Sequence, residues 1–426
     1  MLHWLNLSNI GPSSHLNMML GYRLSLITGD NGLGKSFLLE SMWYALTQTW
    51  TGEPVLPTDR AREALIVGAL TGEEDLFTFS FSRPAFRWTA PLPPPQGRAG
   101  LVVHALADGG FAVWDAARCV QTTADDSTRR QAYRFEPAQV WSGLSDGQGN
   151  RLCEGLLRDW ASWQREGGER FALLQRALTA LSPSPEHPLR PGRLTRVSIT
   201  DPFEYPTLTM PYGQDVPLIH ASAGMRRIVA LAYLLVWTWT EHRAVAELRG
   251  VEPEREVVFL IDEIETHLHP QWQRRIVPAL LDVVEAMTGA DEINVQLIAT
   301  THAPLVLASM ETRFDTARDK VFELDLRDGE VVLSEFDWAL QGDANGWLTS
   351  SVFDLKQPRS LEAERAIEAA QALTRQQDAP LEALESAHRE LLRVLGPHDP
   401  FFVRWNMFYQ QRGGRPIFAD DASETP

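Results

Sequence analysis

Lysine is almost absent from this 426-residue sequence and occurs only at Lys35, Lys320 and Lys356, although lysine and arginine together number 39. In so arginine-rich a chain, a lysine at position 35 calls for an explanation. Acidic residues number 56 and the formal net charge is −17. This negative net charge argues against a protein that binds nucleic acid across one broad basic face. It leaves room for a local basic groove.

Cysteine and long apolar runs are scarce as well. Two cysteines, Cys119 and Cys153, are too few for a disulfide framework or a cysteine metal site. No apolar run reaches the ~18 residues that span a bilayer, and residues 1–17 lack the basic and apolar regions of a signal peptide. We therefore expect a cytoplasmic protein with no membrane partner. Its length suits two or three coupled lobes.

Residues 29–36 read GDNGLGKS and match the phosphate-binding pattern GxxxxGK[ST] without a gap. A strand is expected before them at 23–28, and a helix is expected from Ser36 onward. Glycines let main-chain N–H groups approach phosphates, and the helix N-terminus favours negative charge. We expect Lys35 to reach the β- and γ-phosphates and Ser36 to ligate Mg²⁺. The predicted ATP-binding residues are Gly29, Asp30, Asn31, Gly32, Leu33, Gly34, Lys35 and Ser36.

An acidic pair follows a second strand. Residues 257–261 (VVFLI) form a continuous apolar run, which is typical of a buried parallel strand. Downstream of a phosphate cradle, Asp262 would hold Mg²⁺ and Glu263 would polarise the attacking water. His302 follows another apolar run at 295–299, where a histidine can touch the γ-phosphate. Lys35, Glu263 and His302 are therefore the candidate catalytic residues.

A second anion-binding pattern opens the long apolar helix expected at 222–243. Residues 221–227 read ASAGMRR, and a small Ser-x-Gly turn at a helix N-terminus favours an anion. Together the motifs resemble those of ABC-type ATPases of the SMC, RecF and overcoming-lysogenization-defect (OLD) group, whose signature is LSGGQ. Ser222 and Gly224 fall where that group places its phosphate ligands, whereas Ala223 and Met225 depart from the signature.

The resemblance covers residues 1–50 and 216–305 and has several implications. In this group the signature helix of one protomer caps the γ-phosphate bound by the other, which implies a homodimer that sandwiches ATP. The group also has a glutamine that touches Mg²⁺, and Gln139 in RFEPAQVWSGL is our candidate. The sequence lacks the sustained heptad pattern that would predict a coiled-coil arm. The residues after His302 lack a convincing acidic cluster, so we expect no Toprim nuclease domain.

The predicted fold is α/β, a P-loop NTPase with an ABC-type ATPase head, an inserted antiparallel β region and a helical lobe. Short alternating runs between residues 53 and 135 favour the inserted sheet. The expected domains are the first half of the nucleotide-binding lobe (1–52), the β-rich insertion (53–140), the helical lobe (141–215), the signature helix with the second half of the nucleotide-binding lobe (216–350), and a helical C-terminal region (351–426).

The resemblance suggests three functions. The first is an ATPase that senses or regulates a separate effector, a nuclease or toxin, in bacterial antiviral defence. The second is a RecF-like DNA-repair clamp, with DNA as a partner in a groove that uses Arg226, Arg227, Arg274 and Arg275. The third is a scaffold that binds ATP and scarcely hydrolyses it. Fold alone does not decide among them.

Overall fold

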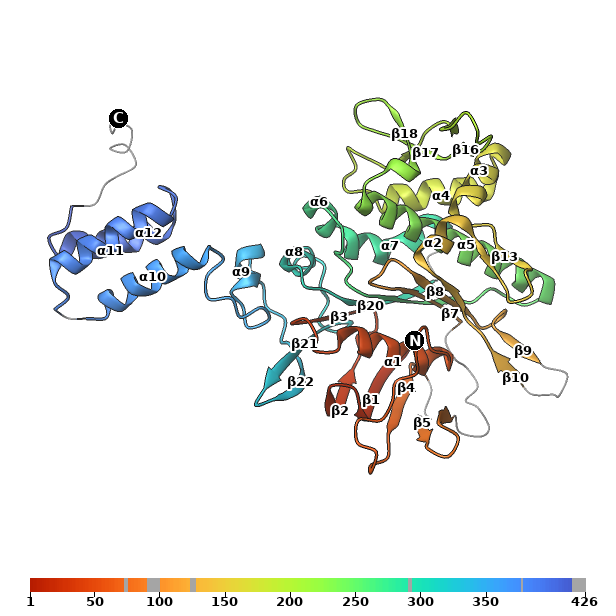
Figure 1. The fold of residues 1–426 in the computed structure, drawn as a ribbon, viewed down its shortest axis with the longest axis horizontal. Coiled ribbons are helices and arrows are strands. Elements are labelled where there is room, and N and C mark those ends of the chain that lie inside the picture. Colours follow the sequence, from red (N-terminus) through yellow and green to blue (C-terminus); the bar gives the residue numbers. More distant parts are fainter. Residues whose placement is uncertain (73–75, 90–99, 123–127, 290–292, 377, 416–426) are drawn as a thin grey trace. The chain divides into compact units, whose positions relative to one another are not determined.

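The chain forms two compact units in a computed structural model, Met1–Trp347 and Leu348–Pro426, and each is described by itself (Figure 1). The structure describes residues 1–72, 76–89, 100–122, 128–289, 293–376 and 378–415. The first unit carries every motif identified above. It combines a mixed sheet with helices, so the predicted α/β class is confirmed.

An eight-stranded sheet forms the centre of the first unit, in the order β11-β8-β7-β19-β20-β3-β21-β22. Its five middle strands run parallel. β8 and β22 pair antiparallel with the two outer members of these five, and β11 pairs antiparallel with β8. Continuous apolar runs suit strands that are covered on both faces. The strands are β3 (Leu24–Gly29), β7 (Leu101–Ala105), β8 (Phe111–Asp115), β11 (Tyr133–Phe135), β19 (Glu256–Ile261), β20 (Asn294–Thr300), β21 (Asp319–Arg327) and β22 (Glu330–Glu335).

One face of this sheet packs on α1 (Lys35–Thr47). Beyond α1 lies a second, antiparallel sheet in the order β2-β1-β4-β5-β6 (Figure 1). Buried residues of both sheets and of α1, among them Leu5, Trp43 and Ile298, form one hydrophobic cluster. The strands of the second sheet are β1 (Leu2–Ile10), β2 (Ser13–Met19), β4 (Leu65–Leu70), β5 (Phe77–Ser82) and β6 (Arg87–Thr89).

Helices cover the other face of the central sheet. Leu235 of α5 (Ala223–Arg249) and Val284 of α7 (Ile276–Thr288) line one small cavity with Val103 and Phe259 of the sheet. The adjoining helices are α2 (Pro137–Ser142), α3 (Leu156–Glu166) and α4 (Glu169–Ala180), and α4 packs on both α5 and α7. The predicted signature helix α5 thus packs on the sheet that carries the predicted phosphate cradle.

Residues 53–140 do not form the single inserted sheet that we expected. Strands β4, β5 and β6 extend the antiparallel sheet of β1 and β2, whereas β7, β8 and β11 belong to the central sheet. The reason is the run at β7, whose residues are all buried and which pairs in parallel with β19. Such a strand needs cover on both faces and therefore takes a place inside the sheet.

Smaller elements complete the first unit. They are β9 (Val120–Thr122), β10 (Thr128–Arg130), β12 (Leu144–Ser145), β13 (Arg151–Cys153), β14 (Arg190–Pro191), β15 (Thr195–Arg196), β16 (Glu204–Tyr205), β17 (Thr207–Thr209), β18 (Asp215–Pro217), the 3₁₀ turn Leu218–His220, α6 (Pro270–Gln273), α8 (Pro304–Ala308) and α9 (Ala344–Leu348). Each pairs or packs locally and leaves the order of the two main sheets unchanged.

The second unit is a small helical body. Its helices are α10 (Leu361–Thr374), α11 (Leu381–Val394) and α12 (Phe401–Gln411). Ile367, Leu391 and Trp405 lie in its own hydrophobic core. Across the described parts of both units, none of the helices has the length and apolar character that crossing a bilayer demands.

Candidate functional site

The predicted phosphate cradle lies between β3 and α1. Gly29 and Gly34 have φ angles of 135° and 96°, a region that glycine adopts readily. There is also no space for side chains, because a Cβ on Gly29 would lie 2.2 Å from the Leu324 carbonyl oxygen and one on Gly34 would lie 2.7 Å from Pro12. The backbone therefore takes a shape that other residues could not, as a loop that wraps phosphates requires.

Lys35 is buried at the start of α1, and its ammonium group donates to the carbonyl oxygens of Gly29 and Asp30, each at 2.8 Å. Burial lowers its pKa, and the nearby charges of Asp262 and Glu263 oppose that shift. The Lys35 side chain thus bends back over the loop of residues 29–36 and lies near the charges of the acidic pair. Asp30, Asn31, Gly32 and Ser36 are exposed around it, so the loop is open to a ligand.

The acidic pair follows β19, the neighbour of β20 in the sheet. Asp262 is buried, and its Oδ1 accepts a hydrogen bond of 2.6 Å from the Thr300 hydroxyl. That hydroxyl also accepts from the Glu263 N–H at 2.7 Å. Glu263 has a φ of 45°, which is uncommon for a residue other than glycine. A strained backbone held by hydrogen bonds is a frequent feature of functional turns.

Glu265 is a member of this site that the sequence analysis missed. Its carboxylate accepts from the Thr301 hydroxyl at 2.7 Å and from the His302 N–H at 2.6 Å. It therefore ties the predicted catalytic turn to the loop that carries His302. The acid is plain in the run DEIE, but its partners lie more than 35 residues further along the chain. Only the pairing of β19 with β20 brings them together.

Ser222 and Gly224 lie at the start of α5. Ser222 is the exposed N-cap residue, and its hydroxyl accepts from the Met225 N–H at 3.4 Å. Gly224 is buried, and a Cβ there would lie 2.5 Å from the His267 carbonyl oxygen. Ala223, Arg227 and His267 line a neighbouring cavity of about 360 Å³. The start of the helix thus touches the turn that follows the chain's own acidic pair.

Gln139 has a local structural partner. It is the third residue of α2, and its Oε1 accepts from the Glu136 N–H at 2.8 Å as half of a capping box. This arrangement satisfies an otherwise unpaired donor at the helix start. The magnesium role of Gln139 stays a prediction, and its amide oxygen would have to leave the cap to fulfil it.

Magnesium binding has to be judged from the donors that the site offers. Among the described residues, no group of three or more His, Cys, Asp or Glu side chains is arranged to hold a metal ion. Mg²⁺ usually keeps water and phosphate oxygens and takes only one or two carboxylates from the protein. Ser36 beside the cradle and Asp262 at the end of β19 fit that smaller requirement.

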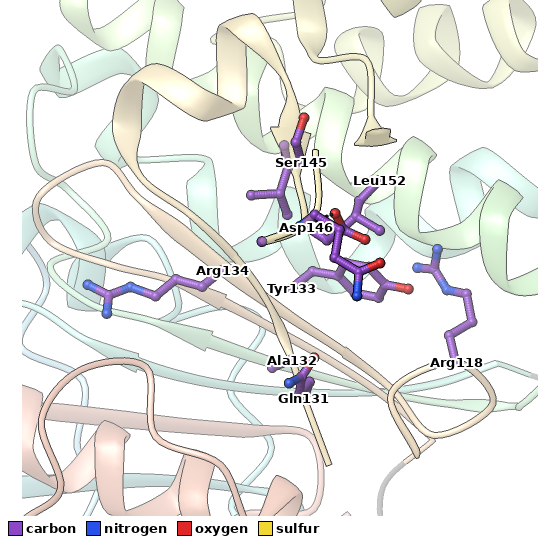
Figure 2. Close-up of a pocket in the computed structure, with 11 residues that line it drawn as sticks. Arg118, Gln131, Ala132, Tyr133, Arg134, Ser145, Asp146 and Leu152 are labelled. Carbon is purple, nitrogen blue, oxygen red and sulfur yellow. Dashed lines mark hydrogen bonds between the residues drawn. The ribbon is translucent and has the colours of Figure 1, made fainter. Parts of the chain in front are cut away.

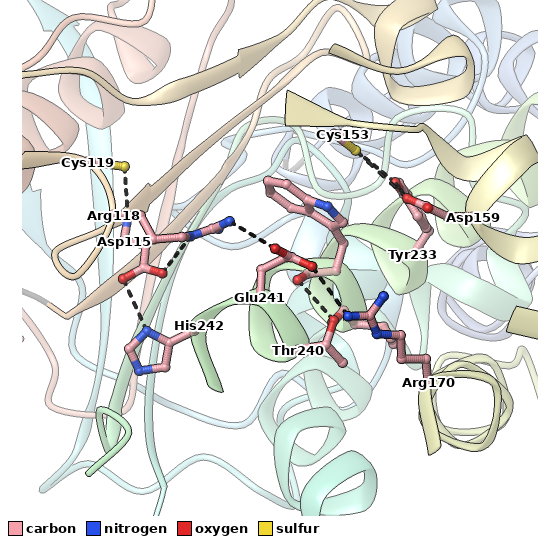
Figure 3. A network of polar contacts seen from close by, with 12 residues as sticks. Asp115, Arg118, Cys119, Cys153, Asp159, Arg170, Tyr233, Thr240, Glu241 and His242 are labelled. Atoms are coloured by element: carbon pink, nitrogen blue, oxygen red, sulfur yellow. Dashed lines mark hydrogen bonds and ion pairs between the residues drawn. The ribbon is translucent and has the colours of Figure 1, made fainter. Parts of the chain in front are cut away.

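A cavity of about 650 Å³ lies elsewhere, between β11 and the β12–β13 hairpin (Figure 2). Its lining includes Arg118, Tyr133 and Asp146, and it contains none of the predicted site residues. Arg118 lies over the Tyr133 ring, 4.7 Å from its centroid, and donates to Asp115 at 2.9 Å. Figure 3 shows that this contact belongs to a larger polar network. The contacts of Arg118 with buried Asp115 and with the Tyr133 ring favour a structural role for these side chains.

Comparisons with known proteins relate parts of the chain to a family and to several relatives. Residues 127–308 match the family described as "AAA domain, putative AbiEii toxin, Type IV TA system". The chain is 39% identical to the "Retron Ec83 probable ATPase" of Escherichia coli over 56 residues, which is 13% of this chain and 9% of that protein. It is 36% identical to the "Septu protein PtuA" of Bacillus mycoides over 89 residues, which is 21% of this chain and 10% of that protein.

These matches are short. The chain spans about a tenth of the length of the curated relatives that it matches. Among solved structures, it is similar to the "SMC head domain from Thermotoga maritima" with a TM-score of 0.38 and 16% identity, over 79% of this chain and 99% of that one.

Proposed function

Because the motifs of this chain resemble those of ABC-type ATPases of the SMC, RecF and OLD group, and residues 127–308 match an AAA domain family, we propose that it binds and hydrolyses ATP in a head-to-head dimer. We further propose that this cycle controls a separate effector, a nuclease or toxin, in bacterial antiviral defence. The observation that carries the ATPase proposal is the glycine-dependent loop of residues 29–36, over which buried Lys35 donates to two carbonyl oxygens. The charges of Asp262 and Glu263 are near enough to raise the Lys35 pKa against the effect of burial.

Each residue of the site has a proposed task. The N–H groups of residues 29–36 surround the phosphates, and Lys35 exchanges its carbonyl partners for phosphate oxygens. Ser36 and Asp262 would hold Mg²⁺, which would supply neutralisation of the phosphate charge. Glu263 orients water and accepts its proton. Catalysis of this kind depends on positioning and charge, so the turn that holds Glu263 matters as much as its carboxylate.

The dimer supplies the other half of each site. Ser222 is exposed at the N-terminus of a helix of 27 residues, where unpaired N–H groups and the helix dipole favour a phosphate. We propose that Ser222 and Gly224 of one protomer approach the γ-phosphate held by its partner. Hydrolysis would then require two copies, and turnover would be slow below the concentration at which they associate.

The effector role rests on the resemblance of the motifs and on two matched relatives, a retron ATPase and a Septu protein. The test uses tagged Glu263→Gln, which should hold ATP without cleaving it. The bait is expressed beside its neighbouring genes, isolated with Mg²⁺–ATP, and analysed by sizing and mass spectrometry. A stoichiometric nuclease or toxin supports the proposal. A bare dimer that retains DNA replaces it with a repair clamp, and a wild-type chain inactive even with its partners indicates a scaffold.

A further inference from the structure

Arg227 joins the signature helix to the acidic turn of its own chain. Its Nη2 donates to the carbonyl oxygen of Asp262 at 2.9 Å and to that of Glu263 at 3.5 Å, and its Nη1 donates to the carbonyl oxygen of Leu106 at 3.4 Å. Arginine suits hydrogen bonding to several carbonyl oxygens because its guanidinium presents several N–H donors in a fixed plane. One side chain thus holds the main chain at the ends of β19 and β7.

Arg227 donates to main-chain carbonyl oxygens and not to carboxylates. A buried or half-buried arginine is usually paired with a carboxylate, yet no salt bridge links Arg227 to an acid among the described residues. Burial lowers its pKa, and the charges of Asp262, Glu263 and Glu265 oppose that shift. The acids are therefore near enough to stabilise the cation while their carboxylates keep other partners. Asp262 is bonded to Thr300, and Glu263 accepts from Thr266 at 2.8 Å.

The backbone of Glu263 needs such a restraint. Its φ of 45° belongs to a region that costs free energy for a residue with a side chain. The Thr300 hydroxyl fixes the N–H of Glu263 on one side, and Arg227 contacts the carbonyl groups of Asp262 and Glu263 on the other. Since φ and ψ set the direction of the side chain, these contacts also set where the Glu263 carboxylate points.

A second contact links the same two elements. Gly224 leaves no room for a Cβ against the carbonyl oxygen of His267, which would lie 2.5 Å away. The start of α5 therefore touches the turn 262–268 at two places, through Gly224 and through Arg227. Glu265, inside that turn, holds the N–H of His302. A shift of the helix start would be passed to the turn, because close-packed backbones cannot slide independently.

We propose that Arg227 is a positioning residue that holds Glu263 in place and makes its orientation depend on the signature helix of the same chain. This inference rests on the proposed ATPase function. When Ser222 of one protomer contacts the phosphate bound by its partner, the start of helix α5 in that protomer shifts. This shift moves the turn 262–268 of the same protomer, which carries its own Glu263. Each site would then become active when its chain has completed the other site, and the two ATP molecules would be hydrolysed together.

The kinetic test compares Arg227→Lys with Arg243→Lys. Lysine keeps the charge but cannot hold several carbonyl groups in one plane. Arg243 lies near the other end of α5 in an exposed ion pair with Glu169. We expect Arg227→Lys to lower kcat roughly 100-fold, with the Kd for ATP and ATP-driven dimerisation within about twofold of wild type. Arg243→Lys should match wild type in all three. Equal loss of binding and turnover in Arg227→Lys, or no loss of turnover, would overturn the inference.

Hydrogen exchange tests the coupling without hydrolysis or substitution. In wild type, a non-hydrolysable ATP analogue with Mg²⁺ at a dimer-forming concentration should slow exchange at residues 224–228 and at the amides of Glu263, Thr266 and Leu268 together. Protection of the helix start without the turn would refute the inference even if the chain hydrolyses ATP. Coupled protection in a chain that does not hydrolyse ATP would contradict the proposed function and leave the mechanical link standing.

Discussion

The Thr300 hydroxyl, at the end of β20, donates at 2.6 Å to Oδ1 of Asp262, which directly follows the neighbouring strand β19 and lies 38 positions earlier in the chain. The same oxygen accepts from the Glu263 N–H, so one hydroxyl fixes both members of the acidic pair. The geometry of the pair is thus set by β20 as well as by its own strand.

Thr300→Val should disable hydrolysis and destabilise the fold. Valine fits the same space but leaves the partly buried Glu263 N–H and one oxygen of buried Asp262 without this partner, which costs up to about 1–3 kcal/mol for each unsatisfied group. Chemical unfolding gives the stability and a phosphate-release assay gives kcat. Thr179→Val is the matched control, because Thr179 is exposed and bonds only to its own helix. Wild-type turnover in Thr300→Val would refute the assigned role.

Gly224→Ala tests the contact between the signature helix and the acidic turn. The added Cβ would lie 2.5 Å from the His267 carbonyl oxygen, so one backbone segment has to move, at a cost of about 1–3 kcal/mol. We expect a lower melting temperature and a loss of turnover. Gly52→Ala is the control, since nothing lies within 4 Å of a Cβ there. If both variants keep wild-type stability and activity, the contact between Gly224 and the acidic turn contributes neither to folding nor to hydrolysis.

Most of the phosphate cradle follows from local sequence. The pattern at 29–36 needs a strand before it and a helix after it, and β3 and α1 confirm this setting. Asp328-Gly329 is likewise a two-residue hairpin signal, and β21 and β22 pair on either side of it. Such features depend on a few neighbouring residues whose turn and periodicity preferences are strong.

The contacts that organise the site could not be predicted in the same way. Arg227 on the Asp262 carbonyl, Glu265 on the His302 N–H and β7 beside β19 all join segments far apart in sequence. Periodicity reports which face of an element is buried, but it does not say which strand will be its neighbour. This is why the region 53–140 was wrongly expected to be one separate sheet.

Glu40 should make stability depend on pH. Burial raises the pKa of its carboxyl group to about 7, and Thr51 donates to it. A carboxyl whose pKa is higher in the folded chain than in the unfolded chain favours folding at low pH, and this contribution falls as pH rises from about 4.5 to 7. Glu40→Gln keeps an acceptor for Thr51 without the charge.

We therefore expect Glu40→Gln to be more stable than wild type at pH 8.5, by up to about 3 kcal/mol, and to lose most of this advantage at pH 5. Urea unfolding of both proteins at the two pH values measures the difference. A constant difference across this range would contradict the assignment of a buried, protonated Glu40.

Asp115 is the centre of the network in Figure 3. It is fully buried and accepts from Arg118 at 2.9 Å and from His242 Nδ1 at 3.1 Å. Although burial alone would raise its pKa, His242 and Arg118 hold it below the usual value. Asp115→Asn removes the charge that balances Arg118 and should cost about 3–5 kcal/mol.

Urea unfolding at pH 7 measures this cost. Asp282→Asn is its control, because Asp282 forms an exposed pair with Arg313 and such pairs contribute about 1 kcal/mol or less. Equal effects of the two substitutions would show that the buried network does not organise this region.

We propose that two copies of this chain close on ATP and that Glu263 then activates water. Size-exclusion chromatography with light scattering, combined with phosphate release, tests this for wild type, Lys35→Ala and Glu263→Gln in Mg²⁺–ATP. We predict that Glu263→Gln forms a stable dimer with bound ATP and no turnover, that wild type turns over, and that Lys35→Ala stays monomeric without nucleotide. A Glu263→Gln chain that hydrolyses ATP at the wild-type rate, or that binds ATP only as a monomer, would contradict the claim.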